Sequence, residues 1–275
     1  QIAAKTAMLD AISNGRLDVG FARAYLPHEF STFQVSMDGS RDIFEKTIEA
    51  VIRLWTEENV SIATPHFNFN NANSLPKPVQ QPHPPVWGAA VMSRQSFSWL
   101  AEKGFNLLVT PPLDGLVCLR DKMDVYMETY LSCHPGKTPR VTLSMPLLLA
   151  DNEKEAIYLS DQYLSKYIQV WASATETWSR HASTDYPGYT GLGNILRSNT
   201  PERMRELLQV LVGTPEKVVD QINQIAKTHT LDQIIWQIDF GAQPEFVSRR
   251  TVELFIEKVM PHIECHDKGK DIYVV

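Results

Sequence analysis

The sequence predicts an α/β fold in which parallel strands alternate with helices. Five short apolar runs are spread along the 275 residues, and each is followed by at least one stretch with helical periodicity. Because strand, helix and strand in succession form a right-handed crossover, this order makes the strands parallel. Hydrophobic residues make up 43% of the chain, which is enough for a large core and excludes a disordered or disulfide-scaffold protein.

The first half of the chain contains three of the five predicted strands. A helix over Ile2–Ser13 stops at an Asn-Gly pair that tolerates a left-handed backbone, and the strand Leu17–Ala22 follows. Ser40 is a candidate cap for a helix over Arg41–Trp55, whose apolar residues fall on one face. A proline-rich loop comes next. The elements expected after it are the strand Val86–Val91, a helix over Ser93–Gly104, the strand Asn106–Thr110 and a helix over Leu116–Leu131.

The second half contains the other two strands and one long irregular stretch. The elements expected here are the strand Val141–Ala150, a helix over Glu153–Trp171, helices over Pro201–Val212 and Pro215–Lys227, the strand Leu231–Phe240 and a helix over Pro244–Met260. Residues 172–200 are rich in Ser, Thr, Gly and Tyr and have weak periodicity, which predicts a long loop. Residues 262–275 are predicted to be a polar tail.

The pattern of strands and turns favours a barrel over a doubly wound sheet. A doubly wound sheet that binds a dinucleotide carries a glycine-rich turn after its first strand, and this chain has none. A barrel needs eight strands, and five would supply strands 4 to 8. We therefore expect residues 1–275 to form a single (β/α)8 TIM-barrel-type domain without its first three βα units, which amount to about a hundred residues.

Charge and cysteine content narrow the range of partners. Lys and Arg total 26 against 32 for Asp and Glu, and the net charge of −6 without a basic stripe argues against a nucleic-acid partner. The apolar runs are far shorter than the roughly 20 residues that cross a bilayer, so we expect no membrane partner. The cysteines, Cys118, Cys133 and Cys265, are widely spaced, which predicts a reduced cytoplasmic location and no metal site.

The end of the first predicted strand carries a candidate ligand-binding residue. Within Leu17–Tyr25, Arg23 stands between two alanines just beyond the strand. In a parallel α/β fold the carboxyl ends of strands form the ligand face, where a guanidinium can bind a phosphate through two hydrogen bonds. The alternative interpretation is an ion pair between Arg23 and a neighbouring carboxylate such as Glu29.

A second candidate lies at the end of the next strand. The run Trp87–Ser96 passes from small residues into a serine-rich helix start, where free backbone N–H groups and the helix dipole attract an anion. The alternative is that Ser93 is an ordinary helix cap, which uses the same backbone groups.

Taken in order, the motifs of this chain resemble the bacterial luciferase-like monooxygenases. The resemblance is carried by Ala7–Asp10, Ser13–Gly20, Pro27–Phe30, Ser40-Arg41, Leu54-Trp55, Pro76–Gln80, Pro84–Trp87, Val212–Glu216, Asp239–Gly241 and Val259–Pro261, and it covers nearly the whole chain. It implies a (β/α)8 barrel that holds reduced FMN, or in related branches a deazaflavin, at its carboxyl face. A separate reductase supplies the reduced flavin, and the enzyme oxygenates an aldehyde, a sulfonate or another small organic substrate.

The resemblance also implies roles for individual residues. Arg23 matches a family arginine on the flavin phosphate, Arg41 a second basic residue near it, and Ser93 and Ser96 the helix start that receives the same phosphate. Residues 172–200 lie where the family has a mobile lid. The family has Gly-Arg-Gly where this chain has alanine on both sides of the arginine. No histidine here matches the family's active-site histidine, so the catalytic residue stays unknown.

Three functions are open at this stage. The leading hypothesis is an FMN-dependent monooxygenase acting on an aldehyde or a natural-product intermediate. Its partners would be a flavin reductase and a dimer mate or complementing chain. The second is a non-catalytic luciferase-like subunit or a degenerate flavin-binding homologue. The third is a deazaflavin-dependent oxidoreductase that moves hydride without oxygen.

Overall fold

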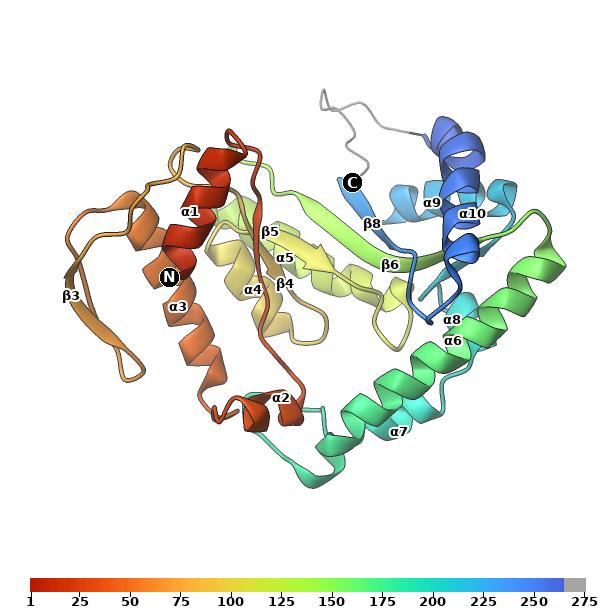
Figure 1. The fold of residues 1–275 in the computed structure, drawn as a ribbon, viewed down its shortest axis with the longest axis horizontal. Coiled ribbons are helices and arrows are strands. Elements are labelled where there is room, and N and C mark those ends of the chain that lie inside the picture. The colour runs from red at the N-terminus through yellow and green to blue at the C-terminus, as the bar shows by residue number, and fades with distance from the viewer. Residues whose placement is uncertain (265–275) are drawn as a thin grey trace. The chain divides into compact units, whose positions relative to one another are not determined.

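The computed structural model describes residues 1–264, which fall into two compact units (Figure 1). The first unit contains residues 1–89 and 180–190, and the second contains residues 90–179 and 191–264. Both units are built on parallel strands with helices between them in the chain. The predicted α/β class is therefore confirmed.

The first unit pairs the two strands that precede the candidate ligand residues. β1 (Val19–Phe21) runs parallel to β4 (Val86–Ala89). The helices of this unit are α1 (Ile2–Ile12), α2 (Pro27–Thr32) and α3 (Ser40–Thr56), of which α2 was not predicted. α1 and α3 lie side by side (Figure 1), and the indole nitrogen of Trp55 on α3 donates a hydrogen bond to the carbonyl oxygen of Ala3 over 3.0 Å.

A buried carboxylate fixes the proline-rich loop next to α1. Asp10 is fully buried, and its Oδ2 accepts hydrogen bonds from the backbone N–H groups of Val79 at 2.8 Å and Gln80 at 3.0 Å. The side-chain amide of Gln80 donates to Asp10 Oδ1 at 2.7 Å and to the carbonyl oxygen of Leu17 at 2.6 Å. Because a buried charge is stable only when its oxygens are hydrogen-bonded, this network holds the chain in place just ahead of β1.

A small antiparallel hairpin follows α3 and was not predicted. β2 (Val60–Ala63) pairs with β3 (Asn68–Ala72). The pairing is supported by polar side chains, because Ser61 Oγ donates to Asn70 Oδ1 at 2.5 Å. Such a hairpin lacks the apolar alternation by which a half-buried strand is recognised in a sequence.

In the second unit, β6 (Val141–Leu149) is the central strand. It runs parallel to β5 (Asn106–Val109) and to β8 (Gln233–Gln237), and both partners pair with the same residues near its start. β5 and β8 therefore lie on opposite edges of β6. Among the predicted strands, this spatial order matches their order in the chain.

The helix predicted over Pro201–Val212 is wrong in its second half. α8 (Pro201–Glu206) ends early, and Leu208 adopts a left-handed φ of +51°. The chain then forms β7 (Leu211–Gly213), which pairs in parallel with the last three residues of β6. The side-chain amide of Gln209 fixes this turn by donating to the carbonyl oxygen of Leu113 at 2.8 Å.

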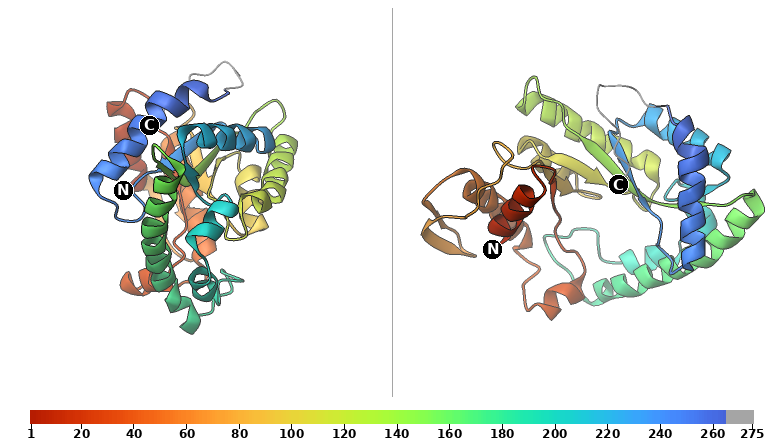
Figure 2. Two further views of the ribbon diagram at one scale, coloured as in Figure 1. Left: turned by 90° about the vertical axis from the view of Figure 1, so that its right-hand side faces the viewer. Right: turned by 45° about the horizontal axis from the view of Figure 1, so that its top comes forward.

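The irregular stretch predicted over residues 172–200 is only partly a loop. α6 (Glu153–Thr175) continues beyond its predicted end, and the 3-10 turn Glu176–Arg180 extends it with a buried tryptophan. α7 (Leu192–Arg197) forms inside the same stretch and packs against α6, as two views show (Figures 1 and 2). Within this stretch, residues 181–191 and 198–200 are without helix or strand, and the role of residues 172–200 as a lid stays a prediction.

The other helices follow the predicted pattern. They are α4 (Arg94–Glu102), the 3-10 turn Leu116–Leu119 with α5 (Arg120–Cys133), α9 (Pro215–Thr228), and α10 (Glu245–Leu254) with the π-helical turn Phe255–Val259 and the 3-10 turn Met260–His262. None of the helices in residues 1–264 combines the length and the apolar character needed to cross a bilayer. Most of the predicted polar tail, together with Cys265, lies outside the described residues.

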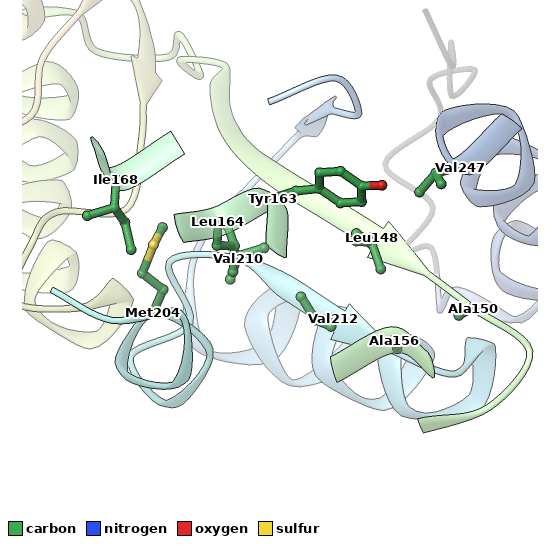
Figure 3. Close-up of a cluster of buried hydrophobic side chains, with 10 residues drawn as sticks. All are labelled: Leu148, Ala150, Ala156, Tyr163, Leu164, Ile168, Met204, Val210, Val212 and Val247. Carbon is green, nitrogen blue, oxygen red and sulfur yellow. The ribbon is translucent and has the colours of Figure 1, made fainter. Parts of the chain in front are cut away.

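The core of the second unit lies between α6 and the strands (Figure 3). Apolar side chains of α6 pack with residues of β6, β7, α8 and α10. The buried members are Leu148, Ala150, Ala156, Tyr163, Leu164, Ile168, Met204, Val210, Val212 and Val247. Burial of this continuous surface is the main stabilising contribution in this part of the chain.

We expect Gly241→Ala to destabilise the second unit. A Cβ at this position would stand 2.3 Å from the carbonyl oxygen of Tyr163 on α6, and a backbone atom cannot rotate away. Overpacking of this kind lowers the free energy of unfolding by about 1–3 kcal/mol, measurable by urea denaturation. The matched control is Gly20→Ala, where nothing lies within 4 Å of the new methyl group. Equal midpoints for the two variants would contradict the prediction.

Candidate functional site: an anion-binding cluster in the first unit

Arg23 lies two residues beyond β1, and its side chain is directed toward residues 180–190 of the same unit. Its Nη2 donates a hydrogen bond to the carbonyl oxygen of Asp185 at 3.1 Å, and its Nη1 stands 3.9 Å from Asp185 Oδ2. The guanidinium carbon lies 4.1 Å from the ring centroid of Tyr186, which is a cation–π distance. The side chain is 18% exposed, so the charge is largely removed from water.

The start of α3 contributes the second part of this cluster. Gly39 precedes the helix with a left-handed φ of +82°, and Ser40 is the first helical residue rather than the predicted cap. Asp185 Oδ2 accepts hydrogen bonds from the backbone N–H of Arg41 at 3.1 Å and from Ser40 Oγ at 3.4 Å. The carboxylate therefore sits at the positive end of the helix dipole and 3.9 Å from the Arg23 guanidinium, while the guanidinium of Arg41 pairs with Glu45 one turn along α3.

Aromatic side chains form one side of the cluster. The Tyr186 hydroxyl donates to the carbonyl oxygen of Ala24 and lies 3.3 Å from Ser40 Oγ. The ring of Tyr189 stands edge-on to Tyr186 at 5.4 Å between centroids, and Tyr25 lies 6.1 Å from Tyr189. Burial raises the pKa of both Tyr186 and Tyr189, so both remain neutral phenols at neutral pH.

The surroundings of Arg23 balance its positive charge only in part. Burial lowers the pKa of Arg23 and the positive charge of Arg41 lowers it further, whereas Tyr186, Asp185 and Tyr189 raise it. Its Nη1 is buried and has no hydrogen-bond partner. An unpaired donor on a buried cation is costly, so an anion with several oxygens would satisfy this group better than the single carboxylate oxygen 3.9 Å away.

Ser93 and Ser96 lie in the second unit, at the start of α4. Ser93 is the residue that precedes the helix, but its side chain makes no capping hydrogen bond. The N–H of Ser96 donates to the carbonyl oxygen of Ser93 at 2.9 Å. This helix start thus departs from the ordinary side-chain cap that was the alternative interpretation.

Arg23 and Arg41, two of the predicted site residues, come together around one carboxylate. The alternative interpretation, an ion pair between Arg23 and a carboxylate, is present in the structure, but its partner is Asp185 and not Glu29. Glu29 Oε2 instead accepts from the N–H of Leu26 at the start of α2. Asp185 is the residue that the sequence analysis missed. It lies in a stretch without periodicity, and its partners are about 145 residues away in the chain.

An open cavity of about 270 Å³ adjoins this cluster within the first unit. It is lined by α2, by residues 35–38 and by His181 and Ala182. Phe30 of α2 contributes to its wall and also contacts the Tyr186 ring edge-on at 6.1 Å. Residues 1–264 contain no group of three or more His, Cys, Asp or Glu that could hold a metal ion.

The sequence profile of the luciferase-like monooxygenases matches residues 1–231, which is most of the chain. The chain belongs to the luciferase-like monooxygenase family. The resemblance inferred from the sequence motifs is therefore confirmed, and the chain is an enzyme of the flavin-dependent monooxygenase class.

Two members of the luciferase-like family resemble the chain over almost its whole length. The oxygenase component of a flavin-dependent trigonelline monooxygenase from Acinetobacter baylyi is 27% identical over 273 residues, which are 95% of this chain and 71% of the relative. The crystal structure of the monooxygenase RslO1 from Streptomyces bottropensis is 31% identical, with a TM-score of 0.77. The match covers 95% of this chain and 73% of that protein. This likeness confirms the barrel-type α/β fold.

More distant solved structures share the luciferase-like fold. The oxygenating constituent of 3,6-diketocamphane monooxygenase from Pseudomonas putida, in complex with FMN, has a TM-score of 0.73 at 18% identity, covering 96% of this chain and 75% of that one. An F420-dependent secondary alcohol dehydrogenase has a TM-score of 0.72 at 12% identity, covering 96% and 74% respectively. At these identities the likeness concerns the fold alone.

Proposed function

We propose that this protein is the oxygenase component of an FMN-dependent monooxygenase that acts on a small organic substrate. The observation that carries the proposal is the cluster around Arg23. A buried guanidinium with an unpaired donor, next to Arg41 and the start of α3, suits an anion such as the flavin phosphate. The substrate class that we propose, an aldehyde or a natural-product intermediate, comes from the family resemblance.

The residues present fit a phosphate monoester. Arg23 would bind two phosphate oxygens through its planar fork, and Arg41 would add charge and its backbone N–H. Ser93 and Ser96, at a helix start without a side-chain cap, are proposed as phosphate-binding residues from the family resemblance alone. Bound reduced FMN would supply two electrons, so that one atom of O2 enters the substrate and the other leaves as water.

The other side chains of the cluster would exclude water and orient the cofactor. Tyr25, Tyr186 and Tyr189 form a continuous aromatic surface beside the guanidinium. Burial raises the pKa of Tyr186, so this phenol stays neutral and adds no negative charge beside the phosphate, while its hydroxyl donates to the carbonyl oxygen of Ala24. The protein would thus hold the flavin in a low-dielectric environment, where the chemistry is protected from bulk water.

The proposal includes a partner and a location. A flavin reductase would deliver reduced FMN, because the chain is similar to the oxygenase component of a monooxygenase that has separate components. We also propose a dimer mate or complementing chain, from the family resemblance. We place the protein in the cytoplasm, which agrees with the free, exposed thiols of Cys118 and Cys133.

We expect oxygen uptake to depend on FMN, NADH, a general flavin reductase and an organic substrate together. An oxygen electrode and product analysis over a panel of aldehydes and small carbonyl compounds would measure it. A matched reaction with coenzyme F420 and an alcohol, without oxygen, tests the deazaflavin alternative. If FMN binds but no substrate is oxygenated, the non-catalytic subunit gains support. If F420 binds and FMN does not, the proposed cofactor is wrong.

A further inference from the structure

The carboxylate of Asp185 occupies the centre of the anion-binding cluster. Its Oδ2 is within hydrogen-bond distance of two donors on α3 and lies 3.9 Å from the guanidinium beyond β1. These three groups come from two elements that are separate in the chain, and the carboxylate comes from residues 180–190. Asp185 Oδ2 therefore accepts from the two donors of α3 that a bound anion would use, and it stands beside the Arg23 guanidinium without a hydrogen bond to Nη1.

A phosphate and this carboxylate cannot share the same donors. A backbone N–H donates one strong hydrogen bond, and the N–H of Arg41 is already used by Asp185. Two anions at one small site also repel each other, at a cost that burial increases. Binding of a phosphate to Arg23 and the start of α3 thus requires the carboxylate to leave.

We propose that Asp185 is an internal anion that occupies the flavin-phosphate subsite in the flavin-free enzyme and thereby sets the affinity for phosphorylated flavins. This inference rests on the proposed function. The carboxylate stands in for the ligand beside the Arg23 guanidinium and at the N–H of Arg41, and it is displaced when FMN binds. Because only a fraction of the flavin-free molecules has the subsite open, the apparent Kd for FMN is raised by the reciprocal of that fraction.

The segment that carries Asp185 has an irregular backbone with two glycines after the carboxylate. Residues 181–191 contain no helix or strand, and Gly188 and Gly191 have left-handed φ values of +85° and +91° with open space around them. A separate contact anchors the segment ahead of the carboxylate, where Ser183 Oγ donates to Asp38 Oδ1 at 2.6 Å. Rotation between this anchor and the glycines would withdraw the carboxylate without unfolding either element of the site.

The test compares Asp185→Asn with the wild-type protein by titration with FMN and with riboflavin, which lacks the phosphate. The amide keeps the size and an acceptor oxygen but loses the charge, so we expect the Kd for FMN to fall about tenfold and the Kd for riboflavin to stay unchanged. Asp42→Asn is the matched control. It removes the same charge from the first turn of α3, where Asp42 pairs with His66. We expect it to change either Kd less than about twofold.

Each outcome separates the two proposals. An unchanged or weaker FMN affinity in Asp185→Asn overturns the proposal that Asp185 is an internal anion. The proposal is also overturned if Asp185→Asn gains as much affinity for riboflavin as for FMN, or if Asp42→Asn gains the same FMN affinity as Asp185→Asn. If Asp185→Asn binds FMN and the wild-type protein does not, the proposal is supported. If neither protein binds FMN, the proposed function fails and this inference fails with it. Thermal melting of each variant shows whether it is folded. Should Asp185→Asn unfold, Ser183→Ala, which removes the anchor instead of the charge, is expected to lower the Kd for FMN in the same direction.

Discussion

Replacing Arg23 with alanine is expected to raise the Kd for FMN about a hundredfold and to leave the Kd for riboflavin within about threefold of wild type. The guanidinium of Arg23 has a buried nitrogen, Nη1, that makes no hydrogen bond within the described residues 1–264. Two charge-assisted hydrogen bonds to a phosphate contribute about 1.5–3 kcal/mol each, and 1.4 kcal/mol corresponds to a factor of ten. Quenching of flavin fluorescence would measure both constants.

Two further variants separate the geometry of Arg23 from its charge. Arg23→Lys keeps the charge but loses the planar fork, so its Kd for FMN should lie between those of wild type and Arg23→Ala. Arg53→Ala removes an exposed arginine at the far end of α3, where it pairs with Glu57, and should leave flavin binding unchanged. Equal losses of FMN and riboflavin affinity in Arg23→Ala would mean that the substitution damages the fold rather than a phosphate site.

The part of the candidate site that depends on local sequence patterns was predictable. Arg23 follows a strand and Arg41 opens a helix, and both features are visible within a few residues of sequence. Asp185 was not predictable, because nothing in its local sequence distinguishes it from other polar loop residues. Its role arises from contacts with residues about 145 positions earlier, and such contacts are set by tertiary structure.

The fold shows the same division between local and tertiary causes. The five predicted strands contain β1, β4, β5, β6 and β8, because each is a compact apolar run bounded by turn residues. β7 was hidden in an apolar stretch that continues the pattern of α8. The helix stops there because Leu208 turns into the left-handed region and Gln209 bonds to a distant carbonyl. Neither event follows from propensity, since leucine and glutamine both favour helices.

Truncation of a buried side chain on α6 is expected to lower the stability of the second unit. Leu164 is fully buried in the cluster between α6 and the strands (Figure 3), so truncation to alanine leaves a cavity as well as losing apolar burial. We expect Leu164→Ala to lower the free energy of unfolding by about 2–5 kcal/mol, measured as a shift of the urea midpoint at constant slope.

The matched control for Leu164→Ala lies on the same helix. Val170 is 67% exposed, and Val170→Ala should change the free energy of unfolding by less than about 0.5 kcal/mol. A small loss in Leu164→Ala would mean that the helix moves inward to fill the cavity, since the cost of truncation depends on how far a site can collapse. That movement is opposed at Gly241, where the loop already touches the backbone of Tyr163 on α6. Because α6 is in close contact at Gly241 and is packed against a continuous apolar cluster, we expect it to stay in place. Leu164→Ala should therefore show the full loss of about 2–5 kcal/mol in the free energy of unfolding.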